Sequence, residues 1–183
     1  MPFLSDTQLE AALLPVLDSA IDATAADFGN IQLRTQEGSQ LKIVVQRGFR
    51  RPFLEFFAVV ADETSCCGAA MAGSRRVIVS DVQSSAIFTE AGRHTMLEAG
   101  ALACQSTPII STSGTVLGML STHFREPHRP LRCQLSRVDG LSRQIARLLQ
   151  APPADSQVGE VARAIEEYRE RSTKTRVIPR RRR

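Results

Sequence analysis

Apolar residues at helical spacing open the chain. Between residues 7 and 24 they recur every three or four positions, which predicts an amphipathic helix. Thr7 and Glu10 stand at the spacing of a capping box, in which each side chain caps a backbone N–H of the first turn. Pro15 lies inside the pattern, so we expect the helix to kink or restart there.

Two pairs of strand-like runs predict two hairpins. Apolar and polar residues alternate over 31–35 and 41–45, and Glu37-Gly38-Ser39 supplies the turn between them. A second pair covers 104–110 and 116–124, and the last strand is apolar on both faces. An antiparallel sheet covered on both faces follows from this pattern.

Between the hairpins the chain predicts shorter elements. Pro52 starts a helical stripe of aromatic residues, which we interpret as core: Phe49, Phe53, Phe56 and Phe57. Small and polar residues over 61–74 predict a loop that enters a short helix near Cys67. A brief strand at 77–79 and a helix over 87–99 follow.

The last long helix is predicted over 131–150. Its apolar seam comprises Leu131, Leu135, Val138, Ile145 and Leu149, and the first helix offers Leu9, Leu13 and Leu17. These side chains have two interpretations. They pack two helices onto a sheet within one chain, or they form part of a four-helix interface in a symmetric homodimer.

Length and charge divide the chain of 183 residues into one domain with an appendage. Residues 1–150 form the predicted domain. Residues 151–183 hold a Pro-rich linker, a short amphipathic helix over 158–168 and a disordered basic tail. From residue 160 onward nine Lys/Arg face four Asp/Glu, a net charge of +5 within a total of +4. The body is therefore near neutral.

The composition also bears on location and on partners. No apolar stretch is long enough to span a membrane, and the first ten residues lack the basic residue of a signal peptide, so we expect a cytoplasmic protein. The tail residues Arg180–Arg183 have two interpretations. They contact phosphates or another acidic surface, including nucleic acid, or they are a solvated end.

The ordered elements resemble the GAF domain, the small-molecule-sensing module of bacterial signalling proteins. The segments that carry the resemblance are 26–33 (ADFGNIQL), 46–49 (QRGF), 65–70 (SCCGAA), 77–82 (VIVSDV), 105–109 (QSTPI) and 117–124 (LGMLSTHF). The run 121–130 (STHFREPHRP) is most similar to GAF domains of sensor histidine kinases. The resemblance implies an α+β fold with a central antiparallel sheet of five to six strands and helices on both faces. The terminal helices would pack together on one face.

The same resemblance implies a pocket on the other face, roofed by the loop 61–74 and the helix 87–99. The candidate lining residues are Phe57, Ser65, Cys66, Cys67, Thr107, Met119, Ser121 and His123. Alternation places Met119, Ser121 and His123 on one side of the last strand, but parity alone does not say which side meets the pocket.

The resemblance implies a non-enzymatic sensory or regulatory module that binds a small molecule or a partner protein. Because no nucleotide-binding domain follows the linker, we expect the signal to leave through a separate protein or through the C-terminal helix and tail. The sequence identifies no cofactor. The alternative is a thiol enzyme such as the GAF-fold free methionine-R-sulfoxide reductases, because Cys67-Gly68-Ala69-Ala70 superficially fits their first cysteine motif. Buried, reduced thiols are the competing interpretation of all four cysteines. His123, Glu126 and His128 match no zinc spacing, so we expect no metal site.

Overall fold

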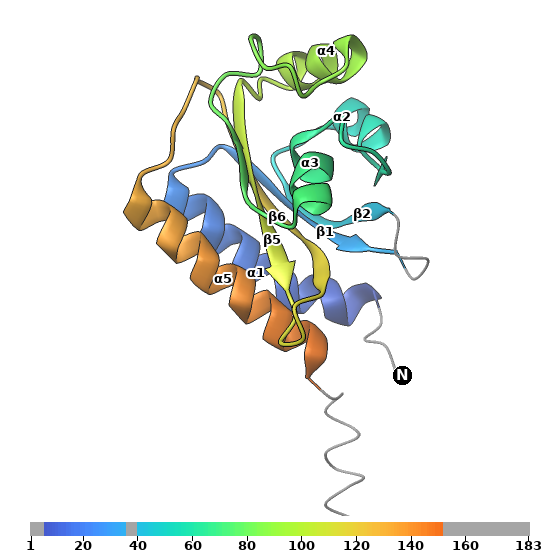
Figure 1. Ribbon diagram of the computed structural model, residues 1–183, viewed down its shortest axis with the longest axis vertical. Coiled ribbons are helices and arrows are strands. Elements are labelled where there is room, and N and C mark those ends of the chain that lie inside the picture. Colours follow the sequence, from blue (N-terminus) through green and yellow to red (C-terminus); the bar gives the residue numbers. More distant parts are fainter. Residues whose placement is uncertain (1–5, 36–39, 152–183) are drawn as a thin grey trace, which may run out of the picture. The chain divides into compact units, whose positions relative to one another are not determined.

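A six-stranded antiparallel sheet organises the protein, and helices lie on both of its faces (Figure 1). The computed structural model describes residues 6–35 and 40–151. The strands run in the order β3-β2-β1-β6-β5-β4. Their bounds are β1 (Phe28–Arg34), β2 (Leu41–Arg47), β3 (Val59–Val60), β4 (Val77–Val79), β5 (Ala103–Ile110) and β6 (Val116–Phe124). The helices are α1 (Asp6–Thr24), α2 (Arg51–Phe56), α3 (Cys66–Gly73), α4 (Glu90–Glu98) and α5 (Arg132–Gln150).

The two predicted hairpins, β1–β2 and β5–β6, meet at the centre of the sheet. There β1 pairs with β6, so that Phe28 lies opposite His123 and Asn30 opposite Ser121. The ladder is antiparallel throughout, as the sequence predicts. This central pairing joins two segments of the chain that are more than 80 residues apart and fixes which side chains of β1 and β6 share a face.

Helices α1 and α5 pack side by side on one face of the sheet (Figure 1). Their apolar residues form a core with β1, β5 and β6, in which the sheet contributes Ile31, Ile109 and Leu120. Helix α1 continues through Pro15, whose side chain is exposed, so the helix does not restart there. The alternative of a kink at Pro15 stays a prediction. The predicted packing of the two terminal helices on one face is confirmed.

Four of the eight predicted seam residues lie fully buried inside this core. Leu13, Leu17, Val138 and Ile145 have no exposed surface, so they pack within one chain and cannot contact a second one. Leu9, Leu135 and Leu149 are half-buried, and Leu131 is 65% exposed. Leu9 and Leu149 also pack against this core from its edge, so core packing accounts for six of the eight positions and leaves Leu131 and Leu135.

Helices α2, α3 and α4 cover the opposite face and enclose a second core (Figure 1). The aromatic stripe supplies much of it. Phe49 and Phe53 stack with centroids 3.7 Å apart, and Phe53 contacts Phe57 at 4.8 Å. Phe56, on the outer side of α2, is 46% exposed. The prediction that the stripe is core is confirmed for three of its four rings.

The remaining elements differ from prediction in their bounds. Helix α4 begins at Glu90 rather than near residue 87, because the Thr89 hydroxyl caps it by accepting from the Gly92 N–H at 3.1 Å. The loop 61–74 contains the eight-residue helix α3. Strand β3 has two residues, too few to show alternation, and the sequence did not predict it.

The predicted turn at 37–39, the linker, the helix over 158–168 and the tail Arg180–Arg183 lie outside the described residues. The described residues from 6 to 150 belong to one compact unit. None of the helices in the described ranges is long and apolar enough to cross a membrane.

Candidate ligand-binding site

The site lies between the sheet and α3, and a local feature of the sequence holds α3 in place. Ser65 precedes the helix, and its hydroxyl accepts from the Gly68 N–H at 3.1 Å. A Cβ at Gly68 would stand 1.7 Å from the carbonyl oxygen of Asp62, so only glycine lets the preceding loop approach the first turn. This capped turn buries Cys66 and Cys67 against β5 and β6.

A small cavity of about 10 Å³ lies beneath α3 and α4. That is close to the smallest space that holds one water molecule. Its lining comprises Asn30, Gln32, Phe53, Phe57, Ser65, Cys66, Cys67, Phe88, Met96 and His123. Every one of these side chains is uncharged when histidine is neutral, so the cavity has a polar sheet floor and an apolar, thiol-bearing roof.

Three buried polar atoms of the floor have no hydrogen-bond partner among the described residues. They are Asn30 Oδ1, Gln32 Oε1 and His123 Nδ1. The three side chains are at most 3% exposed, and the single contact between them joins Asn30 Nδ2 to His123 Nε2 at 3.5 Å. An unsatisfied buried polar group costs about 1–3 kcal/mol, so a water molecule or a ligand that pairs with these three atoms would stabilise the fold.

Burial keeps His123 uncharged at neutral pH. It lowers the pKa of the imidazole from 6.5 to about 3. The ring stands edge-on to Phe49 at 4.9 Å and to Phe53 at 5.8 Å, and no carboxylate faces it among the cavity residues. His123 therefore offers a ligand a neutral nitrogen rather than a positive charge.

The thiols above the floor belong to a chain of weak hydrogen bonds. Cys67 Sγ lies 3.4 Å from the hydroxyls of both Ser106 and Ser121, which contact each other at 2.8 Å. Burial, together with the neighbouring Cys66, raises the pKa of Cys67 to about 11. A thiol with such a pKa is protonated at neutral pH and is a poor nucleophile. The fourth cysteine, Cys133, is exposed on α5.

The predicted lining residues divide into three groups. Phe57, Ser65, Cys66, Cys67 and His123 line the cavity. Met119 and Ser121 belong to the same face of the sheet, since Met119 is part of the core under α2 to α4 and Ser121 contacts Cys67. Thr107 does not line the cavity, contrary to the expectation from the sequence. Its hydroxyl contacts Arg76 on the side of the sheet that α5 covers.

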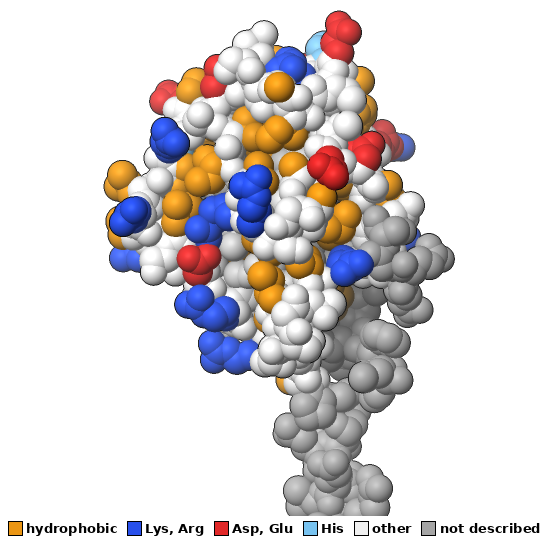
Figure 2. Space-filling model, viewed as in Figure 1, with side chains coloured by type: hydrophobic (Ala, Val, Ile, Leu, Met, Phe, Trp, Pro, Cys, Tyr) orange, Lys and Arg blue, Asp and Glu red, His pale blue; other side chains and the backbone are white. Residues whose placement is uncertain are grey.

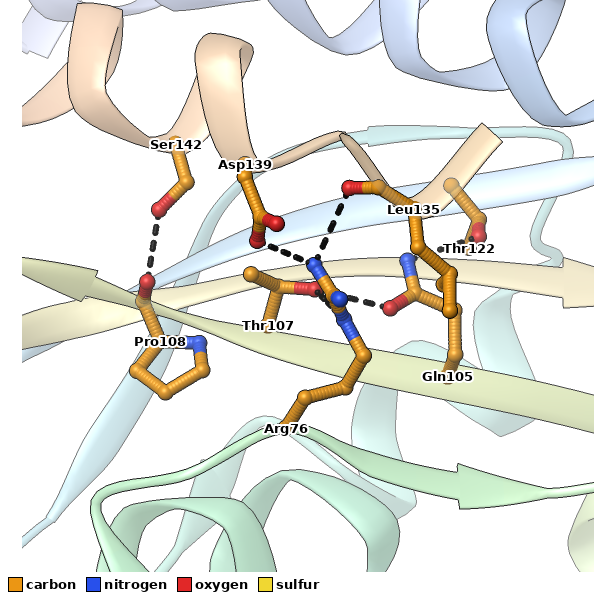
Figure 3. A network of polar contacts seen from close by, with 8 residues as sticks. All are labelled: Arg76, Gln105, Thr107, Pro108, Thr122, Leu135, Asp139 and Ser142. Carbon is orange, nitrogen blue, oxygen red and sulfur yellow. Dashed lines mark hydrogen bonds and ion pairs between the residues drawn. The ribbon is translucent and has the colours of Figure 1, made fainter. Parts of the chain in front are cut away.

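Thr107 instead belongs to a polar network that reaches from the end of α3 to α5 (Figure 3). Arg76 lies between α3 and β4, and its guanidinium donates to Thr107 Oγ1 at 2.9 Å, to the Leu135 carbonyl at 3.3 Å and to the Asp139 carboxylate. The Thr107 hydroxyl donates to Gln105 Oε1 at 2.8 Å, and the Gln105 amide donates to Thr122 Oγ1 at 3.1 Å. The roof of the cavity is thus tied to the long C-terminal helix.

Sequence reasoning missed Asn30 and Gln32, which carry two of the three unpaired atoms. A signal was present, because both alternate with Ile31 along β1 and share the parity of Phe28. Amides at alternate positions ordinarily indicate a solvent-facing side of a strand. The described residues contain no group of three metal-ligating side chains, and His128 stacks on Phe124 with centroids 4.0 Å apart.

Comparisons with known proteins identify the fold. No family model matches the sequence, and no curated protein matches it. Solved structures do match. A domain of a Sinorhizobium meliloti protein described as a two-component sensor histidine kinase superposes with a TM-score of 0.68 at 19% identity, over 81% of this chain and 94% of that one. The GAF domain region of a Geobacter sulfurreducens protein gives 0.66 at 19% identity, over 79% and 94%.

An enzyme shares the same fold. The type II free methionine-R-sulfoxide reductase of Thermoplasma acidophilum superposes with a TM-score of 0.64 at 10% identity, over 79% of this chain and 94% of that chain. The protein therefore has the GAF fold, as the sequence predicts. At these identities the likeness extends to the fold, and that fold serves sensors and an enzyme alike.

Proposed function

We propose that the protein is a non-enzymatic sensory or regulatory module that binds a small molecule between the sheet and the roof formed by α3 and α4. The observation that carries the proposal is the set of three unpaired polar atoms on Asn30, Gln32 and His123 around one cavity. Two of them are carbonyl-type oxygens, which accept hydrogen bonds. The ligand is accordingly an uncharged molecule that presents N–H or O–H donors.

The cavity has room for about one water molecule, so a larger ligand requires the roof to move outward. A shift of α3 would pull on Arg76, because that residue follows α3 and is bonded to α5 through Asp139 and the Leu135 carbonyl. This contact supplies a physical route from the ligand to the helix pair α1–α5 and from there to a signalling partner in a bacterial signalling pathway.

Replacing one unpaired amide by an apolar side chain of similar size tests the proposal. We expect Gln32→Met to raise the free energy of unfolding by about 1 kcal/mol, because it removes an unsatisfied buried acceptor. We also expect it to abolish the chemical-shift changes that acetamide, a neutral donor probe, produces at β1 and α3 in NMR titrations. Acetate, its charged counterpart, should produce none in either protein.

The exposed Gln83 provides the matched control, and Gln83→Met should leave both properties unchanged. A Gln32→Met protein that is less stable and still responds to acetamide would contradict the proposal.

A thiol enzyme is the second candidate, favoured by the two buried cysteines that line the cavity and by the reductase with the same fold. The raised pKa of Cys67 argues against Cys67 as the nucleophile, since a reductase requires a thiolate, whereas a hydrogen bond with Cys104 lowers the pKa of the adjacent Cys66. Turnover of free methionine-R-sulfoxide that Cys67→Ser removes would overturn the non-enzymatic proposal.

We further propose that two chains associate along the seam of α1 and α5. Figure 2 shows Lys and Arg side chains on the side of the molecule where Figure 1 places α5. Arg132, Arg143 and Arg147 of this helix are exposed. These like charges would repel each other across a twofold axis. The observation that supports the proposal is the apolar side chain of Leu131 at the start of α5, which is 65% exposed.

Light scattering should give about twice the 20.1 kDa of one chain. Leu131→Glu should weaken the dimer at least tenfold, whereas Val59→Glu, which changes an exposed residue of the edge strand β3, should not. A wild-type protein that remains monomeric at high concentration would contradict dimerisation.

A further inference from the structure

A second and larger recess opens beside the cavity, on the other side of Phe53. It has a volume of about 460 Å³, within the range of small-molecule sites. Helix α2 forms one wall, the end of α4 forms the other, and the residues after β2 and β6 close its base. We call it the α2–α4 cleft. It shares only Phe53 with the lining of the buried cavity.

Aromatic side chains make the apolar wall of the α2–α4 cleft. Phe53 and Phe28 are buried and anchored by stacking on Phe49, at 3.7 and 5.1 Å between centroids. Phe56 stands beside them and is 46% exposed, so a large apolar ring faces solvent at the cleft. Fixed rings of this kind favour a flat partner, which covers them at little cost in conformational entropy.

Two arginines give the same cleft a positive charge. The Arg125 guanidinium lies over the Phe28 ring, 4.5 Å from its centroid, and its Nε is 3.5 Å from the Asp27 carboxylate. Arg50 lines the cleft as well, and its guanidinium has no ion pair or hydrogen bond with any described residue. The one carboxylate of the lining, Glu98, lies 3.4 Å from His94 Nε2 on its own helix.

We propose that the α2–α4 cleft binds a planar aromatic carboxylate. The ring lies against Phe53 and Phe56, and the carboxylate bonds to Arg50 and Arg125, whose forked donors match its two oxygens. The proposal concerns a site other than the buried cavity and does not depend on the function assigned to that cavity. An uncharged or cationic molecule of the same shape lacks the interaction with the arginines.

Three ligands with one ring system test this assignment: 1-naphthoate, 1-naphthamide and 1-naphthylmethylammonium. Each is followed by its own fluorescence anisotropy, which is simple here because the chain has no tryptophan. We expect naphthoate to bind the full-length protein at least tenfold more tightly than the amide or the cation. We expect added salt to narrow that difference, since the arginines are exposed to solvent.

Two variants locate the contact within the fold. Arg50→Gln should weaken naphthoate binding about fivefold or more and leave naphthamide binding unchanged, and it removes no ion pair or hydrogen bond with the described residues. Arg51→Gln is the matched control, because Arg51 is the next residue, pairs with Glu55 at 2.6 Å and does not line the cleft. Phe56→Ser should weaken all three ligands alike.

Equal affinity for naphthoate and naphthamide would overturn the proposal. So would a loss of naphthoate binding in Arg51→Gln as large as that in Arg50→Gln, because the effect would then follow overall charge rather than the cleft.

Discussion

Lowering the pH from 7 to 5 is expected to cost the folded protein about 2 kcal/mol through His123 alone. The pKa of this imidazole is about 3 in the folded chain and 6.5 in an unfolded one. Between these two values the unfolded state binds the proton and the folded state does not. The contribution of neutral His123 to the free energy of unfolding is therefore fully present well above pH 6.5 and is lost progressively as the pH falls toward 3.

Carboxylates also titrate at low pH, so the informative quantity is a difference between proteins. Denaturant unfolding of wild type and His123→Gln, followed by circular dichroism at pH 7 and pH 5, should show a loss that is about 2 kcal/mol smaller in the variant. His94 is exposed on α4, and His94→Gln should follow the wild type. Equal losses in wild type and His123→Gln would mean that His123 is not the neutral, buried group described here.

Adding one methyl group at Gly118 is expected to destabilise the protein by about 3 kcal/mol or more. Gly118 lies on β6 beside β1, and a Cβ there would stand 2.1 Å from the backbone oxygen of Gln32. The strands must separate to admit it, and these are the central strands of the sheet. The effect extends to the ligand site, because Gln32 carries one of the unpaired acceptors.

The same substitution at Gly140 is expected to act in the opposite direction. Gly140 lies inside α5, and a Cβ there would meet nothing within 4 Å. Alanine restricts the unfolded chain and favours the helix, which should add about 0.5–1 kcal/mol. The two variants, Gly118→Ala and Gly140→Ala, add the same methyl group at a crowded and at an open position. Thermal unfolding should show a lower Tm for the first and a higher Tm for the second. Shifts in Tm of the same sign would contradict the packing at one of these glycines.

Local periodicity made most of the fold predictable. The hairpins and the helix over 131–150 are long enough to display alternation or a helical repeat, and their order resembles the GAF domain. The candidate site was harder to predict from the sequence. Parity groups Met119, Ser121 and His123 correctly, but it does not reveal that Thr107 faces the opposite helices.

The two features of greatest functional interest depend on contacts between distant residues. Asn30 faces His123 only because β1 pairs with β6, and Arg76 reaches Asp139 across an edge of the sheet and 63 residues of sequence. A local pattern gives no information on such partners. The unpaired oxygens of Asn30 and Gln32 are defined by two properties, burial and the lack of a hydrogen-bond partner, and both depend on the tertiary structure.

The pairing of early with late segments also constrains how the chain folds during synthesis. Leu13 and Leu17 of α1 are fully covered only once α5, which ends at Gln150, is in place. At about 5–20 residues per second, a ribosome needs roughly 6–25 s to extend the chain from the end of α1 to the end of α5. For that interval the apolar face of α1 lacks the contacts that α5 later supplies.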